Sequence, residues 1–413
     1  MSGRIHVIGA GLAGLSAALA LTEAGHAVTV YEAGPVAGGR CRSYPDRELG
    51  IRVDNGNHLL LSGNSDAMRF LETIGAAHSL AGPGEPAFPF MDLASGARWT
   101  LRPNRGRLPW WIFSRARRVP GTRAADYLKL LSLPRLTDDR TVAAMLPPGA
   151  LYDRLIAPLA IAALNTRPEV GLARLLGAVV RETLMRGGAA CIPCFPRLGL
   201  SESLIDPALA WLEARGARVL FARRIAALDV ADGRVTALRT TDGTLALDPA
   251  DRVVLAVPAW VASALLPGLS APDAFEAIVN VHFRLDRPPS AAGFIGLTGG
   301  MAEWVFEKPG HASVTISAAN RIVDMSPEMI AQNSWPEVSA ALTLDGPMPK
   351  WRVLKEKRAT FAATAEQDRK RPGPRTALGN LFLAGDWVAT GLPATIEGAI
   401  RSGRNAAETL LAT

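Results

Sequence analysis

Three glycines near the start of the chain have the spacing of a turn that binds phosphate. The run Gly9-Ala10-Gly11-Leu12-Ala13-Gly14 follows an apolar strand predicted over 5–8 and leads into a helix predicted over 12–23. The first glycine permits a tight turn, the second lets a pyrophosphate approach the backbone, and the third lets the helix pack closely on the strand. Because the start of a helix carries unpaired N–H groups and a partial positive charge, the pattern predicts a dinucleotide site.

Glu32 supplies a second feature of such a site, because it follows the next strand, predicted over 27–31. A carboxylate at this place can accept hydrogen bonds from both hydroxyls of an adenosine ribose. It would repel the additional phosphate of NADP, which is therefore disfavoured. Three glycines alone can mark an ordinary loop, but a strand, a helix, a strand and an acid in this register favour dinucleotide binding.

Three further polar residues are candidates for a catalytic or cofactor-binding role, and each also has a purely structural interpretation. Asn165 and Thr166 end an apolar run over 155–164, where they either orient a hydroxyl group or a water, or cap a helix that Pro168 prevents from continuing. Lys357 lies in a stretch with strand-like alternation, so its side chain faces either a bound cofactor or solvent.

The two cysteines of the Cys191-Ile-Pro-Cys194 loop invite a redox or zinc interpretation. A single CxxC lacks a second ligand pair, and the six histidines show no metal spacing, so we expect small apolar side chains in a bent loop and no metal site. The sequence also contains no nucleophile elbow, zinc-protease helix or P-loop. Hydrolase and kinase functions are therefore excluded.

The composition is that of a large globular protein. The 413 residues are 48% hydrophobic and 20% charged, which excludes a disordered chain, a collagen and a coiled coil and predicts two or three packed units. Three cysteines cannot build a disulfide framework, and folded structure is predicted from Ile5 with no room for a signal peptide, so we expect a cytoplasmic protein. The uncharged run 253–272 contains three prolines and is predicted as a strand, a turn and a short helix rather than a membrane span.

One segment, 93–125, carries the whole positive excess of the chain. It has eight arginines and no acid, while the remaining residues sum to a net charge of −1. Basic side chains beside Trp99, Trp110 and Trp111 suit the headgroup layer of an anionic membrane, but a solvated arginine face over core tryptophans has the same composition, and both interpretations stay open. Nucleic acid is not an expected partner, because no recognisable nucleic-acid module accompanies the charges. The arginines are Arg98, Arg102, Arg105, Arg107, Arg115, Arg117, Arg118 and Arg123.

The order of the predicted elements indicates an α/β fold in two interleaved parts. Strands and helices alternate in 1–75, 206–269 and 376–413, as in a Rossmann-like domain. The stretches 76–205 and 270–375 are rich in proline, arginine and aromatic residues with mixed periodicity, and we assign them to an α+β substrate-binding domain inserted twice into the first. Within the first domain the sequence also predicts a hairpin at Asp232-Gly233, strands over 253–257 and 381–384, and a helix over 395–410.

Three more segments resemble one flavoprotein superfamily. They are Gly38-Gly39-Arg40, the polar turn from Asp54 to His58, and Leu383-Ala384-Gly385-Asp386. Together with the glycine turn they are similar to amine oxidases and phytoene desaturases, in which FAD lies extended along a Rossmann-like domain. The resemblance implies that Arg40 and Asp386 lie at the ribityl-pyrophosphate region and that the helix start near 394–396 faces the negatively charged edge of a reduced flavin. The expected cofactor-binding residues are Gly9, Gly11, Leu12, Ala13, Gly14, Glu32, Ala33, Gly39, Arg40, Gly56, Asn57, His58, Ile225, Gly385, Asp386, Ala394, Thr395 and Ile396.

Narrower segments resemble the family of squalene-associated FAD-dependent desaturases, the hydroxysqualene dehydroxylases. They are Leu164-Asn165-Thr166, the stretch 356–364 and the stretch 385–399. One departure is Gly199, where many members of the family carry an acid, so no catalytic acid is expected there. The resemblance implies that an allylic C30 alcohol loses its hydroxyl group and gains hydride from reduced FAD, in squalene or hopanoid synthesis.

The same resemblance makes His58 the expected proton donor, because the turn that contains it is similar to the segment that passes along the flavin ring; a purely structural histidine is the alternative. With Asn165 and Lys357 it completes the candidate catalytic set. The implied substrate is a long apolar isoprenoid in a channel that opens near 93–125, at the inner face of the cytoplasmic membrane, and the electron donor is expected to be external. Alternative functions are an oxidative carotenoid desaturase, an amine oxidase, and a non-catalytic prenyl-lipid carrier.

Overall fold

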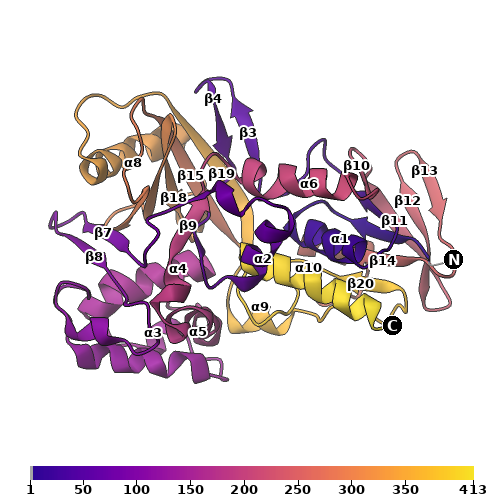
Figure 1. Ribbon diagram of the computed structural model, residues 1–413, viewed down its shortest axis with the longest axis horizontal. Coiled ribbons are helices and arrows are strands. Elements are labelled where there is room, and N and C mark those ends of the chain that lie inside the picture. The colour runs from indigo at the N-terminus through magenta and orange to yellow at the C-terminus, as the bar shows by residue number, and fades with distance from the viewer. Residues whose placement is uncertain (1–2) are drawn as a thin grey trace.

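The computed structural model describes residues 3–413, and a five-stranded parallel sheet forms the part that holds both chain ends (Figure 1). Its strand order is β10-β2-β1-β14-β20. Both faces of the sheet are covered, which explains why its strands are apolar along their length instead of alternating. The strands are β1 (Ile5–Ile8), β2 (Val28–Tyr31), β10 (Arg218–Leu220), β14 (Arg252–Leu255) and β20 (Leu381–Leu383).

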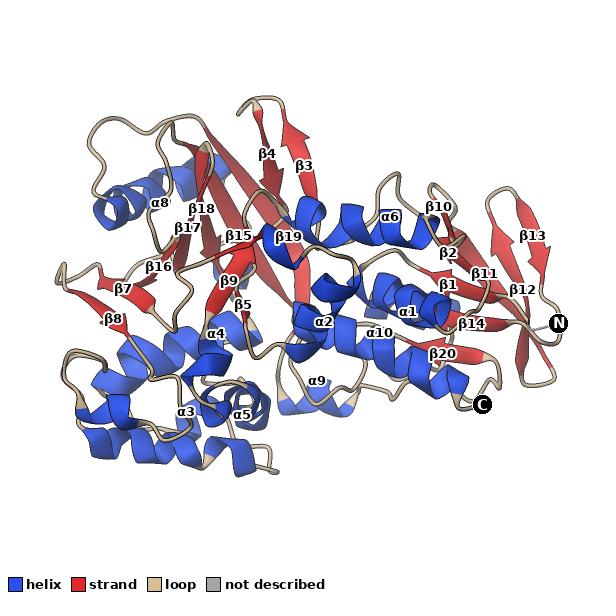
Figure 2. Cartoon of the chain, in the orientation of Figure 1, coloured by secondary structure: helices blue, strands red, loops and turns tan. Residues whose placement is uncertain are grey.

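Helices α1 (Leu12–Glu23), α6 (Asp206–Glu213) and α10 (Ile396–Leu411) cover one face of this sheet (Figure 2). Helices α1 and α10 approach closely because Gly403 has no side chain: a Cβ atom there would lie 2.1 Å from the carbonyl oxygen of Ala13. The other face packs against α7 (Ala259–Leu265) and an antiparallel sheet of β11 (Ile225–Ala231), β12 (Arg234–Thr240) and β13 (Gly243–Ala246). The predicted hairpin is confirmed, because Asp232 and Gly233 have the positive φ angles, 51° and 69°, of a type I′ turn.

A seven-stranded sheet forms the other half of the molecule, in the order β19-β15-β18-β17-β16-β7-β8. All neighbours are antiparallel except β16 and β7. Its strands are β7 (Phe88–Asp92), β8 (Arg98–Leu101), β15 (Phe275–Arg284), β16 (Phe294–Thr298), β17 (Trp304–Lys308), β18 (His311–Ile316) and β19 (Trp351–Phe361).

The two faces of this sheet differ in chemistry. Val279, Val281 and Val314 belong to the face that packs against α8 (Pro327–Leu342). Because side chains alternate along a strand, their neighbours Asn280 and Thr315 point to the opposite face, which lies toward the first sheet. The sheet therefore presents polar groups to the junction between the two halves.

The remaining elements connect and cover the two sheets. A largely helical layer, which includes α3, α4 and α5, lies below the seven-stranded sheet in the orientation of Figure 2. The connecting elements are β3 (Ser43–Asp46), β4 (Ile51–Asp54), β5 (Leu60–Leu61), α2 (Ser65–Thr73), β6 (Leu80–Ala81), α3 (Val142–Met145), α4 (Ala157–Leu164), α5 (Ala173–Glu182), β9 (Pro193–Pro196) and α9 (Ala365–Arg369).

Each large sheet draws its strands from the segments assigned to one domain. The five-stranded sheet uses 1–75, 206–269 and 376–413, and the seven-stranded sheet uses 76–205 and 270–375. The exact domain boundaries stay a prediction. A search of residues 3–413 for a helix with the length and apolar character of a bilayer span finds none.

A group of buried titratable side chains lies where β4 meets the second sheet. Asp54 and Lys308 form an ion pair in which both side chains are only 3% exposed. Burial alone would raise the pKa of Asp54, but Lys308 and the hydroxyl of Ser43 bring it below its ordinary value. The rings of His282 and His311 lie 5.6 Å apart, and neither ring has a hydrogen-bond partner among the described residues. Burial lowers the pKa of His282 to about 3 and that of His311 to about 4.

These histidines predict a loss of stability in mild acid. Unfolded histidine takes up a proton near pH 6.5, whereas the folded rings stay neutral down to about pH 4, so the unfolded chain binds more protons in this window. The free energy of unfolding should rise with pH between about 4 and 6.5, by at most about 1.4 kcal/mol per pH unit for each histidine. Urea unfolding of the apoprotein at several pH values measures this slope.

The matched variant is His282→Leu, which removes the titration without removing a hydrogen bond. For this variant, the free energy of unfolding should rise less steeply with pH, by the contribution of one histidine. Glu303, whose pKa burial raises to about 7, opposes the trend between about pH 4.5 and 7 in both proteins and cancels in the comparison. If the free energy of unfolding depended on pH in the same way for both proteins, His282 would not be a buried neutral ring.

Candidate functional site

The glycine turn between β1 and α1 has the geometry expected for a dinucleotide site. Gly9 has a φ of 106°, and a Cβ atom on it would lie 2.5 Å from the carbonyl oxygen of Ala256. A Cβ on Gly14 would lie 1.9 Å from the carbonyl oxygen of Gly9, so this glycine is needed for helix packing. Gly11 differs from both, because a Cβ on it would meet no atom within 4 Å. Only Gly11 is therefore free of a packing role, as a residue that a phosphate approaches should be.

The carboxylate of Glu32 lies directly beside this turn. Its two oxygens accept hydrogen bonds from the backbone N–H groups of Ala10 at 2.9 Å and Gly34 at 2.8 Å. Each carboxylate oxygen has a further lone pair, so the ribose hydroxyls can still be accepted. Glu32 is thus held in place by the backbone before any ligand binds.

Arg40 and Asp386 form the second half of the predicted site. The Nη2 atom of Arg40 lies 2.7 Å from Oδ1 of Asp386, and its Nη1 donates to the carbonyl oxygen of Ala359 at 2.6 Å. Burial lowers the pKa of Arg40, but the adjacent Asp386 carboxylate more than offsets this, so its pKa lies above the ordinary value. The pair joins residues that are 346 positions apart in the sequence.

Sequence reasoning missed Arg371, which shapes the turn that carries Asp386. This guanidinium is buried, donates to the carbonyl oxygens of Trp387 at 3.3 Å and Val388 at 2.8 Å, and pairs with Asp368 at 2.9 Å. A planar fork with five donors can bind several acceptors at once, which lysine cannot. No local pattern marks this arginine, because its partners lie up to 17 residues further along the chain.

The helix predicted over 395–410 is α10, and its first turn is capped. The hydroxyl of Thr395 accepts a hydrogen bond from the N–H of Gly398 at 3.0 Å. Glu397 does not point to the cofactor side: its carboxylate accepts from the N–H groups of Asp66 and Ala67 and pairs with Arg401. The acid in the first turn thus caps α2, and its charge is compensated by an arginine.

The loop from Asn55 to His58 joins the two halves of the molecule. The carbonyl oxygen of Asn55 accepts from Nδ2 of Asn280 at 3.2 Å, and Nδ2 of Asn57 donates to the hydroxyls of Ser313 at 2.7 Å and Thr315 at 3.0 Å. These partners lie on the polar face of the seven-stranded sheet. The predicted flavin-facing turn is therefore fixed by the second sheet, and Asn280, Ser313 and Thr315 are contacts that the sequence did not reveal.

His58 lies close to three charged groups. Burial lowers its pKa to about 4; Asp54 raises it in part, and Lys308 and Arg40 lower it further. The imidazole is thus neutral at pH 7. This state does not exclude a catalytic role, but a neutral ring is a weak acid.

Asn165 ends the helix, which was one of its two predicted roles, and it also forms contacts with the second sheet. It ends α4 in the left-handed conformation, with a φ of 47°. Its amide donates to the hydroxyl of Thr360 at 2.9 Å and accepts from the N–H of Ala318 at 2.7 Å. Thr166 likewise bonds to the backbone of Ala363. Both residues connect α4 to the second sheet.

Glu303 is a partly buried acid, 3.9 Å from Arg321, that sequence reasoning also missed. Its carboxylate accepts a hydrogen bond from the N–H of Ser317 at 2.7 Å, and Ser317 precedes Ala318, the donor to Asn165. Burial raises the pKa of Glu303 to about 7. Arg321 and the hydrogen bond from Ser317 oppose this rise in pKa in part.

Two other predicted residues, Lys357 and Ile225, have less favourable places, and the surroundings of Gly199 can be described with them. Lys357 is 70% exposed and lies 3.8 Å from Asp324, which favours the solvent-facing alternative over contact with a cofactor. Ile225 is buried in the core with Ile8 and Tyr31, so only its backbone can face a ligand. At Gly199 a Cβ would lie 2.4 Å from Oε2 of Glu202, so the carboxylate of that residue fills the space where a side chain would stand.

The CxxC loop shows two protonated thiols. Burial raises the pKa of Cys191 to about 12 and that of Cys194 to about 11. Neither thiol is therefore activated as a nucleophile or a ligand. A search of residues 3–413 for three or more His, Cys, Asp or Glu side chains that could hold a metal ion finds no such group.

The residues at the junction fit FAD. The Arg40 side chain keeps 33% of its surface accessible and His58 is half-buried, so both can contact a ligand. A Cβ on Gly39 would lie 3.7 Å from the Cα of Gly11, so the two glycines adjoin. Backbone N–H groups, a carboxylate for a ribose and a guanidinium suit the pyrophosphate, ribose and ribityl groups of FAD.

Comparisons with known proteins identify the family to which the chain is similar. The model of the family described as "Flavin containing amine oxidoreductase" matches residues 12–411. The chain is 49% identical to hydroxysqualene dehydroxylase of Rhodopseudomonas palustris, an alignment that covers 100% of this chain and 99% of the relative. It is 48% identical to hydroxysqualene dehydroxylase of Sinorhizobium fredii, again over 100% of this chain and 99% of the relative.

A solved structure shows the same fold. Putrescine oxidase bound to putrescine superposes with a TM-score of 0.73 at 15% identity, over 100% of both chains. Together with the family match, this likeness confirms the predicted fold class, an α/β fold with a Rossmann-like FAD-binding domain.

Gly11 gives a direct test of the phosphate site. Gly11→Val should fold, because the residue has an ordinary φ of −74° and open space around a Cβ. Its side chain would stand where the pyrophosphate approaches, so we expect the purified protein to contain at least tenfold less FAD. The ratio of absorbance at 450 nm to that at 280 nm measures the FAD content.

The control is Gly373→Val, at an exposed glycine that also has open space around a Cβ. This variant should keep its full FAD content and the thermal stability of the unaltered protein. Normal FAD content in Gly11→Val would place the pyrophosphate elsewhere.

Proposed function

The chain belongs to the flavin-containing amine oxidoreductase family and is an FAD-dependent oxidoreductase, and we propose that it converts hydroxysqualene to squalene. In this reaction the allylic C–O bond breaks, the hydroxyl group leaves as water with one added proton, and a C–H bond forms with hydride. Reduced FAD supplies the hydride and is oxidised. The observation that carries the proposal is the 49% identity, along the whole chain, to a hydroxysqualene dehydroxylase.

The proposed cofactor contacts follow from the site. The N–H groups at Gly11 and the start of α1 would face the pyrophosphate, and Glu32 the adenosine ribose. Arg40 and Asp386 would hold the ribityl-pyrophosphate region. The backbone of 394–396, at the start of α10, would stabilise negative charge on the flavin.

The proton for the leaving hydroxyl requires a group that is protonated near neutral pH. His58 is placed at the flavin-facing turn, but its low pKa leaves the ring neutral. Glu303 has the better protonation state, since its pKa is about 7, and it connects through Ser317 and Ala318 to Asn165. Of the two, His58 lies on the turn predicted to face the flavin, so we propose it as the donor by its position, whereas Glu303 lies between Ala302 and Val305, which belong to the core that packs on α8.

The alternative functions are less well supported. A carotenoid desaturase or an amine oxidase would share the fold, but the high identity along the whole chain is to dehydroxylases. A prenyl-lipid carrier would have no use for an unhindered Gly11 or for the pair of Arg40 with Asp386. A reductive reaction on an isoprenoid thus accounts for more of the site than any of these.

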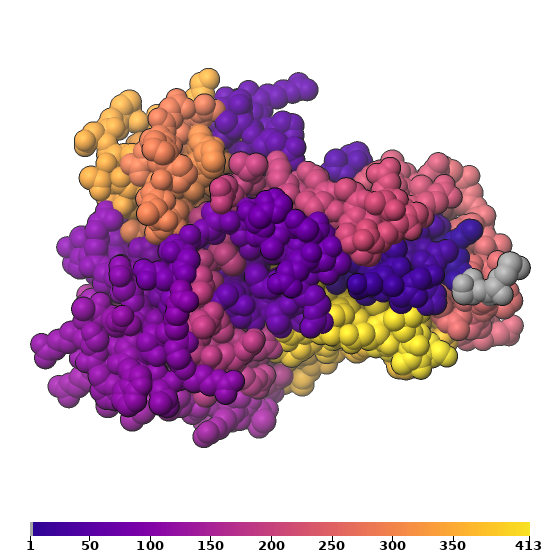
Figure 3. Space-filling view, in the orientation of Figure 1, coloured from indigo at the N-terminus to yellow at the C-terminus, as the bar shows by residue number. Residues whose placement is uncertain are grey.

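We also propose that the segment 93–125 contacts an anionic membrane, from which a lipid substrate could reach the protein. Of its aromatic residues, Trp99 and Trp111 are buried core residues, whereas Trp110 and Phe113 are 66% and 65% exposed. Leu108 beside them is 65% exposed. Exposed apolar side chains among arginines suit a headgroup layer. This part of the chain lies at the far end of the molecule from the two termini (Figures 1 and 3).

The reaction can be tested in one turnover without the natural electron donor. Photoreduced holoenzyme mixed anaerobically with hydroxysqualene should be re-oxidised and form one squalene per flavin. The oxidised holoenzyme is the control and should form no product. Unchanged flavin absorbance with authentic hydroxysqualene would contradict the proposed function.

Membrane contact can be tested by co-sedimentation with lipid vesicles. The protein should bind vesicles with 30% anionic lipid, and binding should weaken at high salt because part of the attraction is electrostatic. The double variant Trp110→Ser/Phe113→Ser should bind at least fivefold less. The control is Val230→Ser, at an exposed apolar residue on β11. Equal binding of the double variant and the control would refute contact through this segment.

A further inference from the structure

Five aromatic side chains form one continuous cluster beside the junction of the two halves, which we call the aromatic wall. Phe195 lies 5.7 Å from Phe306 and 6.2 Å from Phe294, measured between ring centroids, and Phe294 lies 6.1 Å from Trp304. Phe88 completes the cluster. Four of these residues come from the seven-stranded sheet, while Phe195 comes from β9. Phe195, Phe294 and Phe306 are only 2–3% exposed, so the cluster is dry, while Phe88 and Trp304 are partly buried and leave part of their rings accessible.

The aromatic wall adjoins the flavin-facing turn. Phe306 is the cross-strand neighbour of Ser313, whose hydroxyl accepts a hydrogen bond from Asn57. Leu59, which follows His58, packs against the wall. A substrate that lies against these rings would therefore reach the turn that carries Asn57 and His58.

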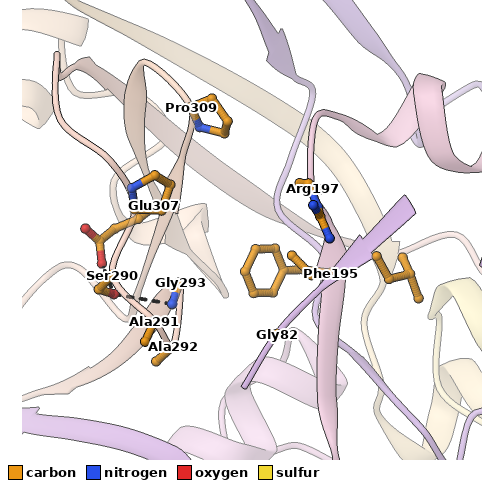
Figure 4. A pocket seen from close by; sticks show the side chains of 12 residues that line it. Gly82, Phe195, Arg197, Ser290, Ala291, Ala292, Gly293, Glu307 and Pro309 are labelled. Carbon is orange, nitrogen blue, oxygen red and sulfur yellow. Dashed lines mark hydrogen bonds between the residues drawn. The ribbon is translucent and has the colours of Figure 1, made fainter. Parts of the chain in front are cut away.

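A cavity of about 390 Å³ opens on the outer side of the wall (Figure 4). Phe195 stands on one side of it, and the loop that leads into β16 stands on the other. The space depends on Gly293, since a Cβ on this residue would lie 2.5 Å from Cζ of Phe195. The volume lies within the range of small-molecule sites, about 300–1,000 Å³. The lining residues include Leu80, Ala81, Phe195, Ala291, Ala292 and Pro309.

Three polar side chains line the cavity: Ser290 and Glu307 bond to each other, and Arg197 is exposed (Figure 4). Glu307 pairs with Arg287 at 2.7 Å and accepts a hydrogen bond from the hydroxyl of Ser290. The carboxylate therefore has little need of a polar ligand. What remains for an occupant is mainly apolar surface, which suits a hydrocarbon better than a charged molecule.

The cavity also lies close to the arginine segment. Gly84, two residues after the cavity residue Gly82, accepts a hydrogen bond from Arg105 at 3.4 Å. Glu85 lies 3.9 Å from Arg102. A lipid that leaves a membrane surface at 93–125 would thus find this opening nearby.

We propose that this cavity holds one end of the isoprenoid chain while the part that reacts lies against the aromatic wall. The inference rests on the proposed function and adds a location for the substrate. Aromatic faces attract a cation, and buried rings exclude water, so the wall suits an allylic cation that must not be recaptured by water. Gly293 and Phe195 would then determine how much of the hydrocarbon the cavity accepts.

A photo-crosslinking experiment tests the location without catalysis. The probe is geranylgeraniol with a diazirine at the end remote from the hydroxyl group, added to oxidised holoenzyme. Peptide mapping should find crosslinks in 80–82, 195–197 or 289–293. Ala292→Trp, which fills the cavity, should reduce them at least fivefold, whereas Ala246→Trp, on exposed β13, should not. Crosslinks elsewhere, or undiminished crosslinks in Ala292→Trp, would overturn the proposal.

Kinetics separate this proposal from the proposed function. In single turnovers of photoreduced enzyme, Ala292→Trp should raise at least tenfold the hydroxysqualene concentration that gives half of the maximal rate of flavin re-oxidation. The maximal rate itself should change little, because only binding of the remote end is lost. Ala291→Trp, at an exposed residue of the same loop, replaces it if Ala292→Trp does not fold. If neither variant changed the conversion of hydroxysqualene, the proposed location of the substrate would be refuted, but the proposed function would not. Crosslinks in the cavity without any conversion of hydroxysqualene would refute the function alone.

Discussion

The buried ion pair between Asp54 and Lys308 holds the two halves of the molecule in register. Breaking such a pair by removing one partner typically costs about 3–5 kcal/mol, because an unpaired charge is left in the interior. Here the pair fixes the end of β4, and the turn from Asn55 to His58 begins at that point. Asn280, Ser313 and Thr315 then hold the turn along the face of the second sheet. The turn that is predicted to face the flavin takes its position from these contacts.

The polar face of the seven-stranded sheet becomes less polar along its length. One surface can therefore contact both a charged cofactor and an apolar substrate. Near Lys308 it carries an ion pair and neutral histidines, near Asn57 it carries hydroxyl and amide groups, and at Phe306 it becomes aromatic. The opposite face is aliphatic and packs on α8. A cation that forms between the polar turn and the rings would be shielded from water while it remains close to the flavin.

Local patterns in the sequence were sufficient for the first sheet. The elements predicted over 5–8, 12–23 and 27–31 are β1, α1 and β2, because glycines, periodicity and the final acid all act over short distances. The left-handed cap at Asn165 also has a local cause. Lys308, Asn280, Arg371 and Glu303 could not be predicted, since their partners lie on other elements and only the fold brings them together. The alternation around Lys357 left its direction open, and the fold places this side chain at the surface.

The central claim is that two electrons pass from the flavin to the carbon that lost its hydroxyl group. The most direct measurement is a single turnover of photoreduced holoenzyme with hydroxysqualene in deuterated buffer, followed by mass spectrometry and NMR of the product. The claim predicts squalene with one deuterium at the former carbinol carbon, because the transferable hydrogen of the reduced flavin exchanges with solvent. Squalene without deuterium at that carbon, or a more unsaturated product, would contradict it.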